Sequence, residues 1–347
     1  MADTKLKLLR VLDILRQTDA DHPLTTAQIA DQLNRYDLSA ERKAINRDIQ
    51  VLKQAGYDIR LCPDNKRGYY LASHSFETWE LKVLIDAIVS AKFLTEADSR
   101  AIAAKLMAQD SQANAQLLAR VTPVNTHIKQ DNPQIKETIG ALLTAIRQQR
   151  KVQFQYQSTN SEMKKELRKG GYCYRINPYA LTWKDEHYYL ICNLDKYDNL
   201  GYYRLDRIVN LTILDEPVKD AVALLGKNPR HRIDDYIATA IYCHTGKKIN
   251  LRLLCQYGME DEICDYFGSD HFHNKRPDGF ECHIRVMHSQ GLIYWLMQHG
   301  SKVKVLAPEA VKKELLDCLR ATLDQYRDDT KKQRVRVMTR HNKRDEV

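Results

Sequence analysis

Residues 39–57 read SAERKAINRDIQVLKQAGY, and their pattern predicts the fold of the N-terminal part of the chain. Ile45, Ile49 and Leu52 recur at the spacing of a helix and supply its buried face. Ser39 precedes them and is the predicted N-cap, because its hydroxyl can accept a hydrogen bond from the free backbone N–H groups of the first turn. The sequence therefore predicts an amphipathic helix whose outer face is rich in basic and amide side chains.

Two further helices and a hairpin surround this helix. Apolar residues recur at helical spacing over residues 5–17, and a segment capped by threonine continues to about Leu33. After the long helix, the pattern becomes strand-like at 57–61 and 69–71. Three short helices followed by a hairpin predict a winged helix-turn-helix domain over residues 1–74, and its third helix would enter the major groove of DNA.

The predicted DNA contacts lie on the third helix and at the tip of the hairpin. Arginine, lysine and asparagine read the edges of guanine and adenine or bind phosphate. The alternative to a DNA-binding helix is a solvated helix with ordinary surface charges. The helix lengths, the predicted cap, the glycine after the third helix and the basic hairpin tip all favour DNA binding. The predicted DNA-binding residues are Ser39, Arg42, Lys43, Asn46, Arg47, Lys66 and Arg67.

The middle of the chain changes from helical to strand-like patterns. Residues 75–130 are predicted to form a helical linker region, and residues 131–217 a small β-rich domain. Apolar side chains alternate strictly from Val152 to Tyr156, as in a half-buried strand. Further short strands are predicted at 173–182, 187–193, 201–206 and 208–214. Short antiparallel strands after one helix indicate a small β-barrel.

The last third of the chain predicts a different arrangement. Residues 230–328 contain elements in the order β-α-β-β-α-β, which is ferredoxin-like. No acidic residue occurs in 331–344, so the basic tail over 329–347 is predicted to be disordered. The fold class predicted for the whole chain is therefore α+β multidomain.

The composition favours an anionic partner and a cytoplasmic protein. The 347 residues include 54 Lys and Arg against 45 Asp and Glu, which gives a formal net charge of +9. Nucleic acid is the commonest partner of such a basic chain. No apolar run reaches the length of a membrane span, and the N-terminus lacks the pattern of a signal peptide. Eight cysteines without a Cys-x-x-Cys pair indicate free thiols.

Neither a metal site nor a catalytic site is predicted. His271 and His273 would share one face of a strand, with His283 and His288 further along, but no cysteine or carboxylate spacing completes a metal site. The motifs of serine hydrolases, P-loop proteins and zinc proteases are also missing from the sequence. We therefore expect no catalytic residues, no metal, no cofactor and no enzyme activity.

The N-terminal motif resembles that of DeoR-like regulators. Residues 42–49, RKAINRDI, followed by Leu52 and by the Ala-Gly-Tyr of 55–57, match the pattern of that family's winged helix. The predicted wing ends in Gly-Tyr-Tyr-Leu at 68–71, which is also typical of the family. The resemblance implies a DNA-binding domain.

The middle segment resembles the WYL domain, which is named for a Trp-Tyr-Leu triplet. Here the triplet reads Tyr-Tyr-Leu at 188–190, and the most specific motif is Tyr-Arg-Leu-Asp-Arg-Ile at 203–208. The C-terminal segment, with Trp295-Leu296, resembles the extension that follows WYL domains. The resemblance implies a homodimeric transcription factor whose Sm-like or SH3-like barrel senses single-stranded DNA or a nucleotide.

The ligand-binding residues that the resemblance implies are Tyr156, Arg175, Tyr188, Arg204 and Arg207. Basic residues interleaved with tyrosines are also what a barrel for single strands requires. Strand alternation would place Arg204 and Arg207 on opposite faces unless a bulge intervenes. An ion pair is the alternative role for Arg207, and barrel core is the alternative for the tyrosines.

The sequence thus predicts a ligand-responsive regulator that binds duplex operator DNA as a dimer. We expect loss of Arg42 or Arg47 to weaken duplex binding, and loss of Arg175 or Arg204 to reduce the ligand response only. A nuclease or accessory factor of DNA repair or defence is the first alternative, although no clustered carboxylates support it. A protein-binding adaptor is the second alternative.

Overall fold

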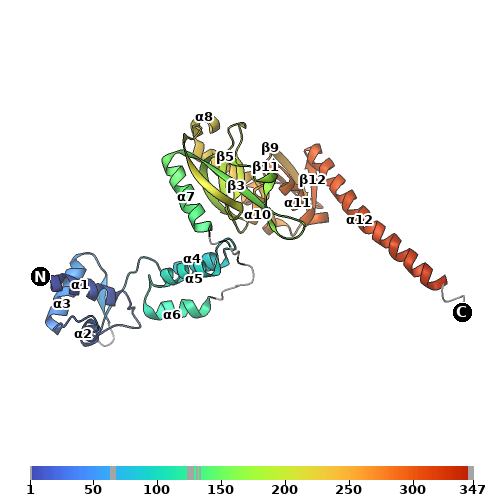
Figure 1. Cartoon of the computed structure of the whole chain (residues 1–347). Coiled ribbons are helices and arrows are strands. Elements are labelled where there is room, and N and C mark those ends of the chain that lie inside the picture. Colours follow the sequence, from blue (N-terminus) through green and yellow to red (C-terminus); the bar gives the residue numbers. More distant parts are fainter. Residues whose placement is uncertain (1, 63–67, 123–128, 130–131, 133, 343–347) are drawn as a thin grey trace. The chain divides into compact units, whose positions relative to one another are not determined.

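A computed structural model gives the fold of the chain (Figure 1). It describes residues 2–62, 68–122, 129, 132 and 134–342, with side chains from residue 4 to residue 327 of these ranges. The chain divides into two compact units, Met1–Ile135 and Lys136–Val347. They are called the N-terminal unit and the C-terminal unit below.

The N-terminal unit begins with three helices and a hairpin. The helices are α1 (Ala2–Leu15), α2 (Thr26–Asn34) and α3 (Arg42–Gln54), and the strands are β1 (Ile59–Leu61) and β2 (Tyr69–Leu71). Their apolar faces share one buried core, which includes Leu15, Ile29, Ile45, Ile49 and Leu71. The predicted order of elements is found, and α3 buries the apolar face that its spacing predicts.

The predicted cap of α3 is wrong. The helix begins at Arg42, and the N-cap is Glu41, which has an extended backbone and no capping side-chain hydrogen bond. Ser39 lies two residues further upstream, beyond the reach of the first turn. By contrast, Thr25 caps α2: its hydroxyl accepts a hydrogen bond from the Gln28 backbone N–H at 3.2 Å, while the Gln28 side chain accepts one from the Thr25 backbone at 2.8 Å.

Three more helices complete the N-terminal unit. They are α4 (Thr78–Ser90), α5 (Glu96–Met107) and α6 (Gln112–Val121). Their own core contains Leu81, Ile85, Val89, Ala103 and Leu118. This segment is helical, as the sequence predicts.

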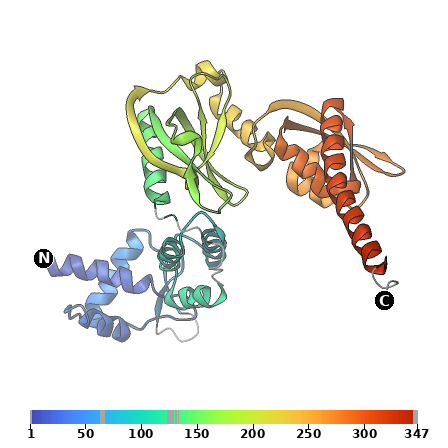
Figure 2. The same cartoon turned by 45° about the vertical axis from the view of Figure 1, so that its right-hand side comes forward.

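The C-terminal unit opens with α7 (Ile135–Gln148) and a strongly curved sheet, which Figure 2 shows in green to yellow. The strands are β3 (Arg150–Thr159), β4 (Lys165–Leu167), β5 (Tyr174–Lys184), β6 (His187–Asn193), β7 (Gly201–Arg204) and β8 (Ile208–Pro217). The sheet order is β4-β3-β5-β6-β7, and β8 pairs with β3.

The predicted barrel is not closed. A short 3₁₀ turn over Leu205–Arg207 separates β7 from β8, and β8 pairs with β3 instead of continuing beside β7. Strands β7 and β8, both fully described, therefore stay unpaired with each other. The strands that the sequence predicts are found, but a 3₁₀ turn separates β7 from β8 and the two strands do not pair, so the sheet is not a closed barrel.

A second sheet follows after α8 (Ala221–Leu225) and α9 (Pro229–Thr239). Its elements are β9 (Lys247–Cys255), α10 (Glu260–Phe267), β10 (Phe272–Arg276), β11 (Gly279–His288), α11 (Gln290–His299), β12 (Val303–Ala307) and α12 (Glu309–Asn342). The four strands are antiparallel in the order β10-β11-β9-β12. The β-α-β-β-α-β order of the elements is the one predicted.

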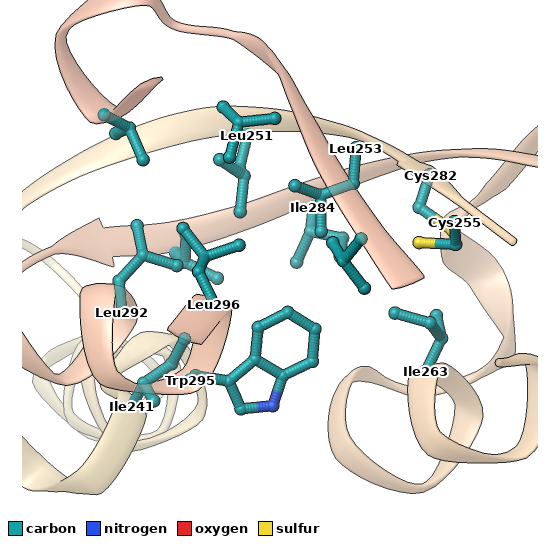
Figure 3. Packing of buried hydrophobic residues seen from close by; sticks show 14 of the residues in the cluster. Ile241, Leu251, Leu253, Cys255, Ile263, Cys282, Ile284, Leu292, Trp295 and Leu296 are labelled. Carbon is teal, nitrogen blue, oxygen red and sulfur yellow. The ribbon is translucent and has the colours of Figure 1, made fainter. Parts of the chain in front are cut away.

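The core of this segment lies between the second sheet and its helices. Trp295 of α11 is 1% exposed and packs among aliphatic side chains such as Leu251, Ile263 and Ile284 (Figure 3). Burying an aromatic ring of this size contributes on the order of several kcal/mol to stability. The helices thus cover one face of the sheet.

The C-terminal tail differs from its prediction. Residues from 329 onward were expected to be disordered, but α12 continues as far as Asn342. Helix formation needs no acidic residues, so the absence of acids did not indicate disorder here. Among the described residues, no helix combines the length and apolar character that crossing a membrane requires.

Candidate nucleic-acid and ligand sites

The outer face of α3 carries free positive charge. Arg42, Lys43 and Arg47 are exposed, and within the described residues none of them forms an ion pair. Asp48, the one acidic residue inside the helix, points to the core side, where its carboxylate lies 3.0 Å from the Lys7 ammonium. The outward charge of the helix is therefore entirely basic, as a surface for phosphate or base edges requires.

The other predicted DNA contacts are placed differently. Asn46 is half-buried, and its side-chain oxygen accepts a hydrogen bond from the Tyr69 hydroxyl at 3.3 Å, so it also links α3 to the hairpin. Ser39 is exposed before the helix. Lys66 and Arg67 lie outside the described residues, and their predicted role stays a prediction.

Four aromatic side chains fill the inside of the first sheet. Their ring centroids lie between 5.2 and 6.4 Å apart, and the residues are Phe154, Tyr156, Tyr174 and Tyr203. Tyr156 is 6% exposed, and its hydroxyl accepts a hydrogen bond from the backbone N–H of Arg204 at 3.1 Å. Burial raises the pKa of this hydroxyl. Tyr156 therefore belongs mainly to the core, which was the alternative role of the tyrosines.

The two arginines of residues 203–208 have separate roles. The guanidinium of Arg204 binds both carboxylate oxygens of buried Asp206, with Nε at 3.0 Å and Nη2 at 2.7 Å. Arg207 is half-buried and forms no ion pair among the described residues. The ion pair that was the alternative for Arg207 is thus made by Arg204. The 3₁₀ turn over these residues also removes the strand alternation on which the prediction of opposite faces rested.

A histidine that the sequence analysis missed lies beside these arginines. Nδ1 of His187 is buried without a hydrogen-bond partner. Burial lowers the pKa of this imidazole, and the nearby charges of Arg204 and Arg207 lower it further. No motif in the sequence marks His187, because only the folded turn brings it near Arg207. An unpaired guanidinium beside an unsatisfied ring nitrogen is a setting that an anion would complete.

The remaining predicted ligand residues lie elsewhere. Arg175 is exposed on β5 and pairs with Glu216 of β8. Alternation along β6 puts Tyr188 on the opposite face from Tyr189, whose cross-strand partner is Arg204. The structure therefore does not bring Arg175 or Tyr188 together with Arg204 and Arg207.

Basic and aromatic side chains also meet at the rim of the sheet. Lys169 lies 5.9 Å from the ring centre of Tyr172, and Lys196 lies 4.7 Å from that of Tyr197. Both tyrosines are about half exposed. Exposed rings beside cations are the pattern of surfaces that stack nucleobases. The pair of Lys196 and Tyr197 lies in a turn that the sequence analysis did not consider.

Comparison with known families identifies this segment. Residues 137–213 match the WYL domain, and residues 247–323 match the WCX domain. The chain contains a WYL domain followed by a WCX domain. The predicted resemblance to WYL proteins is therefore confirmed for these two segments, whereas the DeoR-like winged helix stays a prediction.

Comparison with individual proteins adds little beyond these families. No curated protein matches the sequence. Among solved structures, the Proteasome accessory factor B/C (PafBC) of Arthrobacter aurescens is 18% identical, with a TM-score of 0.30 over 92% of this chain and 48% of its own. A CRISPR Cas-related protein is 12% identical, with a TM-score of 0.37 over 93% and 84%. The chain thus spans about half the length of PafBC.

The characteristic triplet of the WYL domain lies in the centre of β6. Tyr189 and Leu190 are buried there, so these two positions hold the sheet together. The motif at 203–208 instead spans the end of β7 and the turn that carries the buried Asp206 and the half-buried Arg207. In this WYL domain, the turn carries the candidate ligand site, and two residues of the triplet belong to the buried part of the sheet.

Proposed function

We propose that the protein is a DNA-binding transcription regulator that responds to a ligand. The exposed, unpaired basic residues of α3 carry the first half of the proposal, because three helices and a hairpin with such a face suit a winged helix-turn-helix. The WYL domain supports the second half. Its ligand would be an anion, a single-stranded nucleic acid or a nucleotide, bound at Arg207 and His187. The protein would act as a homodimer on a palindromic site, by binding and not by catalysis.

The test is fluorescence anisotropy on duplex fragments from upstream of the protein's own gene. The salt concentration is varied, with and without short single-stranded oligonucleotides. We expect duplex affinity to fall steeply with salt and to shift when an oligonucleotide is added. Duplex binding that ignores oligonucleotides and nucleotides would exclude the proposed ligand class. A complete lack of duplex binding at every salt concentration would contradict the regulator itself, and turnover of DNA would favour a nuclease.

The affinity of the ligand should depend on pH through His187. The pKa of His187 is lowered by burial, Arg204 and Arg207, while Asp206 and Glu186 act in the opposite direction. A bound phosphate would raise that pKa again, so binding takes up a proton. Oligonucleotide affinity should therefore increase as the pH falls from about 8 to about 6. His187→Gln should flatten this dependence, as anisotropy titrations at each pH would show. An unchanged pH profile in the variant would place the ligand away from His187.

A further inference from the structure

The WCX domain has one sheet face that its own helices leave uncovered. At one end of this face Met287 is buried against α9 and the WYL sheet, whereas Arg252 and Lys304 near the other end are exposed. Leu253 of β9 and Ile284 of β11 point into the core beneath the helices. Because side chains alternate along a strand, the residues between them point to the other side. Arg252 and His283 are such residues, and they lie directly opposite each other on the two central strands.

The strands of this sheet are strongly basic. Glu281 is the only acidic residue in β9, β10, β11 and β12. The basic residues of the same strands are Lys247, Lys248, Arg252, Lys275, Arg276, Arg285 and Lys304. At one end Lys248 pairs with Asp235 of α9, and further along the sheet Glu281 pairs with two of the arginines. The rest of the sheet keeps an excess of positive charge.

Glu281 holds two of these arginines in place. Its carboxylate is 2% exposed and pairs with Arg276 and with Nη2 of Arg252 at 3.3 Å, while both guanidinium groups stay about half exposed. One buried acid thus holds two arginines side by side with a net positive charge. Such held guanidinium planes can bind phosphate or stack on bases.

Two imidazole rings extend the same face. His273 and His283 stack with ring centroids 3.9 Å apart and an interplanar angle of 26°. Burial, His273 and Arg252 lower the pKa of His283, which favours an uncharged ring at neutral pH. In the described part of the chain, no group of three metal-ligating side chains forms here. The stacked pair offers an aromatic surface on this face.

We propose that the open face of the WCX sheet binds single-stranded nucleic acid. The charge is complementary to a polyanion, and a sheet surface suits an extended strand. Four-stranded RNA-recognition sheets stack bases on aromatic residues of the sheet, and Arg252 and His283 offer planar groups on the two central strands here. Lys304 on β12 adds an exposed cation without an ion pair among the described residues. This surface is separate from the candidate site at Arg207.

The test compares two charge reversals on opposite faces of one sheet. Lys304→Glu alters the open face, whereas Lys275→Glu alters the other face, since the cross-strand partner of Lys275 is the core residue Phe280. A labelled oligodeoxythymidine of about 15 nucleotides is titrated with full-length protein across a salt series. Lys304→Glu should weaken binding about tenfold and reduce the salt slope by roughly one, and Lys275→Glu should stay within about twofold of the parent.

A double variant, His273→Ala with His283→Ala, tests the stacking part and should weaken binding by about fivefold to tenfold. Its melting profile shows whether the domain still folds. Equal effects of Lys304→Glu and Lys275→Glu would mean that binding follows net charge, and the proposal is wrong. Loss of all binding in Arg207→Ala with no effect of Lys304→Glu would overturn it too, yet would leave the proposed function standing. Weaker binding in Lys304→Glu with no effect of Arg207→Ala would refute the ligand site of the WYL domain and support the WCX surface.

Discussion

Replacing both Arg42 and Arg47 with alanine should weaken duplex binding by about 100-fold or more, since each good base or phosphate contact contributes roughly 1–3 kcal/mol. Both side chains are exposed on α3 and lack ion pairs among the described residues, so their charge is available to DNA. Their removal leaves the buried face of the helix untouched, and stability should change by less than about 0.5 kcal/mol each. Anisotropy with an operator duplex measures the affinity, and thermal melting measures the stability.

Lys53→Ala is the matched control for this double variant. Lys53 is exposed in the last turn of the same helix, and its substitution removes one positive charge, as each of the two arginine substitutions does. A recognition helix that enters the groove by its N-terminal half should tolerate this change within about threefold. If Lys53→Ala costs as much as Arg47→Ala, α3 contributes only general positive charge. If the double variant binds as well as the parent, α3 is not the DNA-binding helix.

The helices and strands of the chain follow closely from local patterns. Ile45, Ile49 and Leu52 are buried as their spacing predicts, because one side of a helix must pack against the core whatever the rest of the chain does. The start of α3 was less predictable. Ser39 and Glu41 both precede the helix, and the backbone turns helical only after Glu41. Caps depend on a few backbone angles, which residue preferences determine only weakly.

The candidate ligand site was predictable only in part. Arg204 and Arg207 come from a motif, but their roles depend on the 3₁₀ turn at 205–207, which periodicity cannot show. In that turn Arg204 forms an ion pair with Asp206, and Arg207 forms none among the described residues. The fold also places His187 close enough to Arg204 and Arg207 for their charges to lower its pKa, although it lies far from both arginines in sequence. Contacts of this kind come from tertiary structure.

Replacing Arg207 with alanine should weaken binding of single-stranded oligonucleotide by about 30-fold or more, and should remove its effect on duplex binding. A half-buried charge that pairs with a ligand typically contributes roughly 2–5 kcal/mol. Arg175→Ala is the control, because Arg175 is exposed and already paired with Glu216. Loss of such a surface pair costs roughly 0–1 kcal/mol, so the response should persist. Duplex affinity without ligand should stay the same in both variants.

Arg204→Ala would not separate these roles. It would remove the guanidinium that binds the buried carboxylate of Asp206, and breaking a buried ion pair destabilises a fold by roughly 3–5 kcal/mol. Arg207→Lys is more informative, since it keeps the charge but loses the planar donor array; partial recovery of binding would indicate a phosphate contact. An equal loss in Arg175→Ala and Arg207→Ala would instead place the ligand on the exposed side of β5. The turn at 205–207 would then have a structural role, with Arg204 and Asp206 as its closing pair.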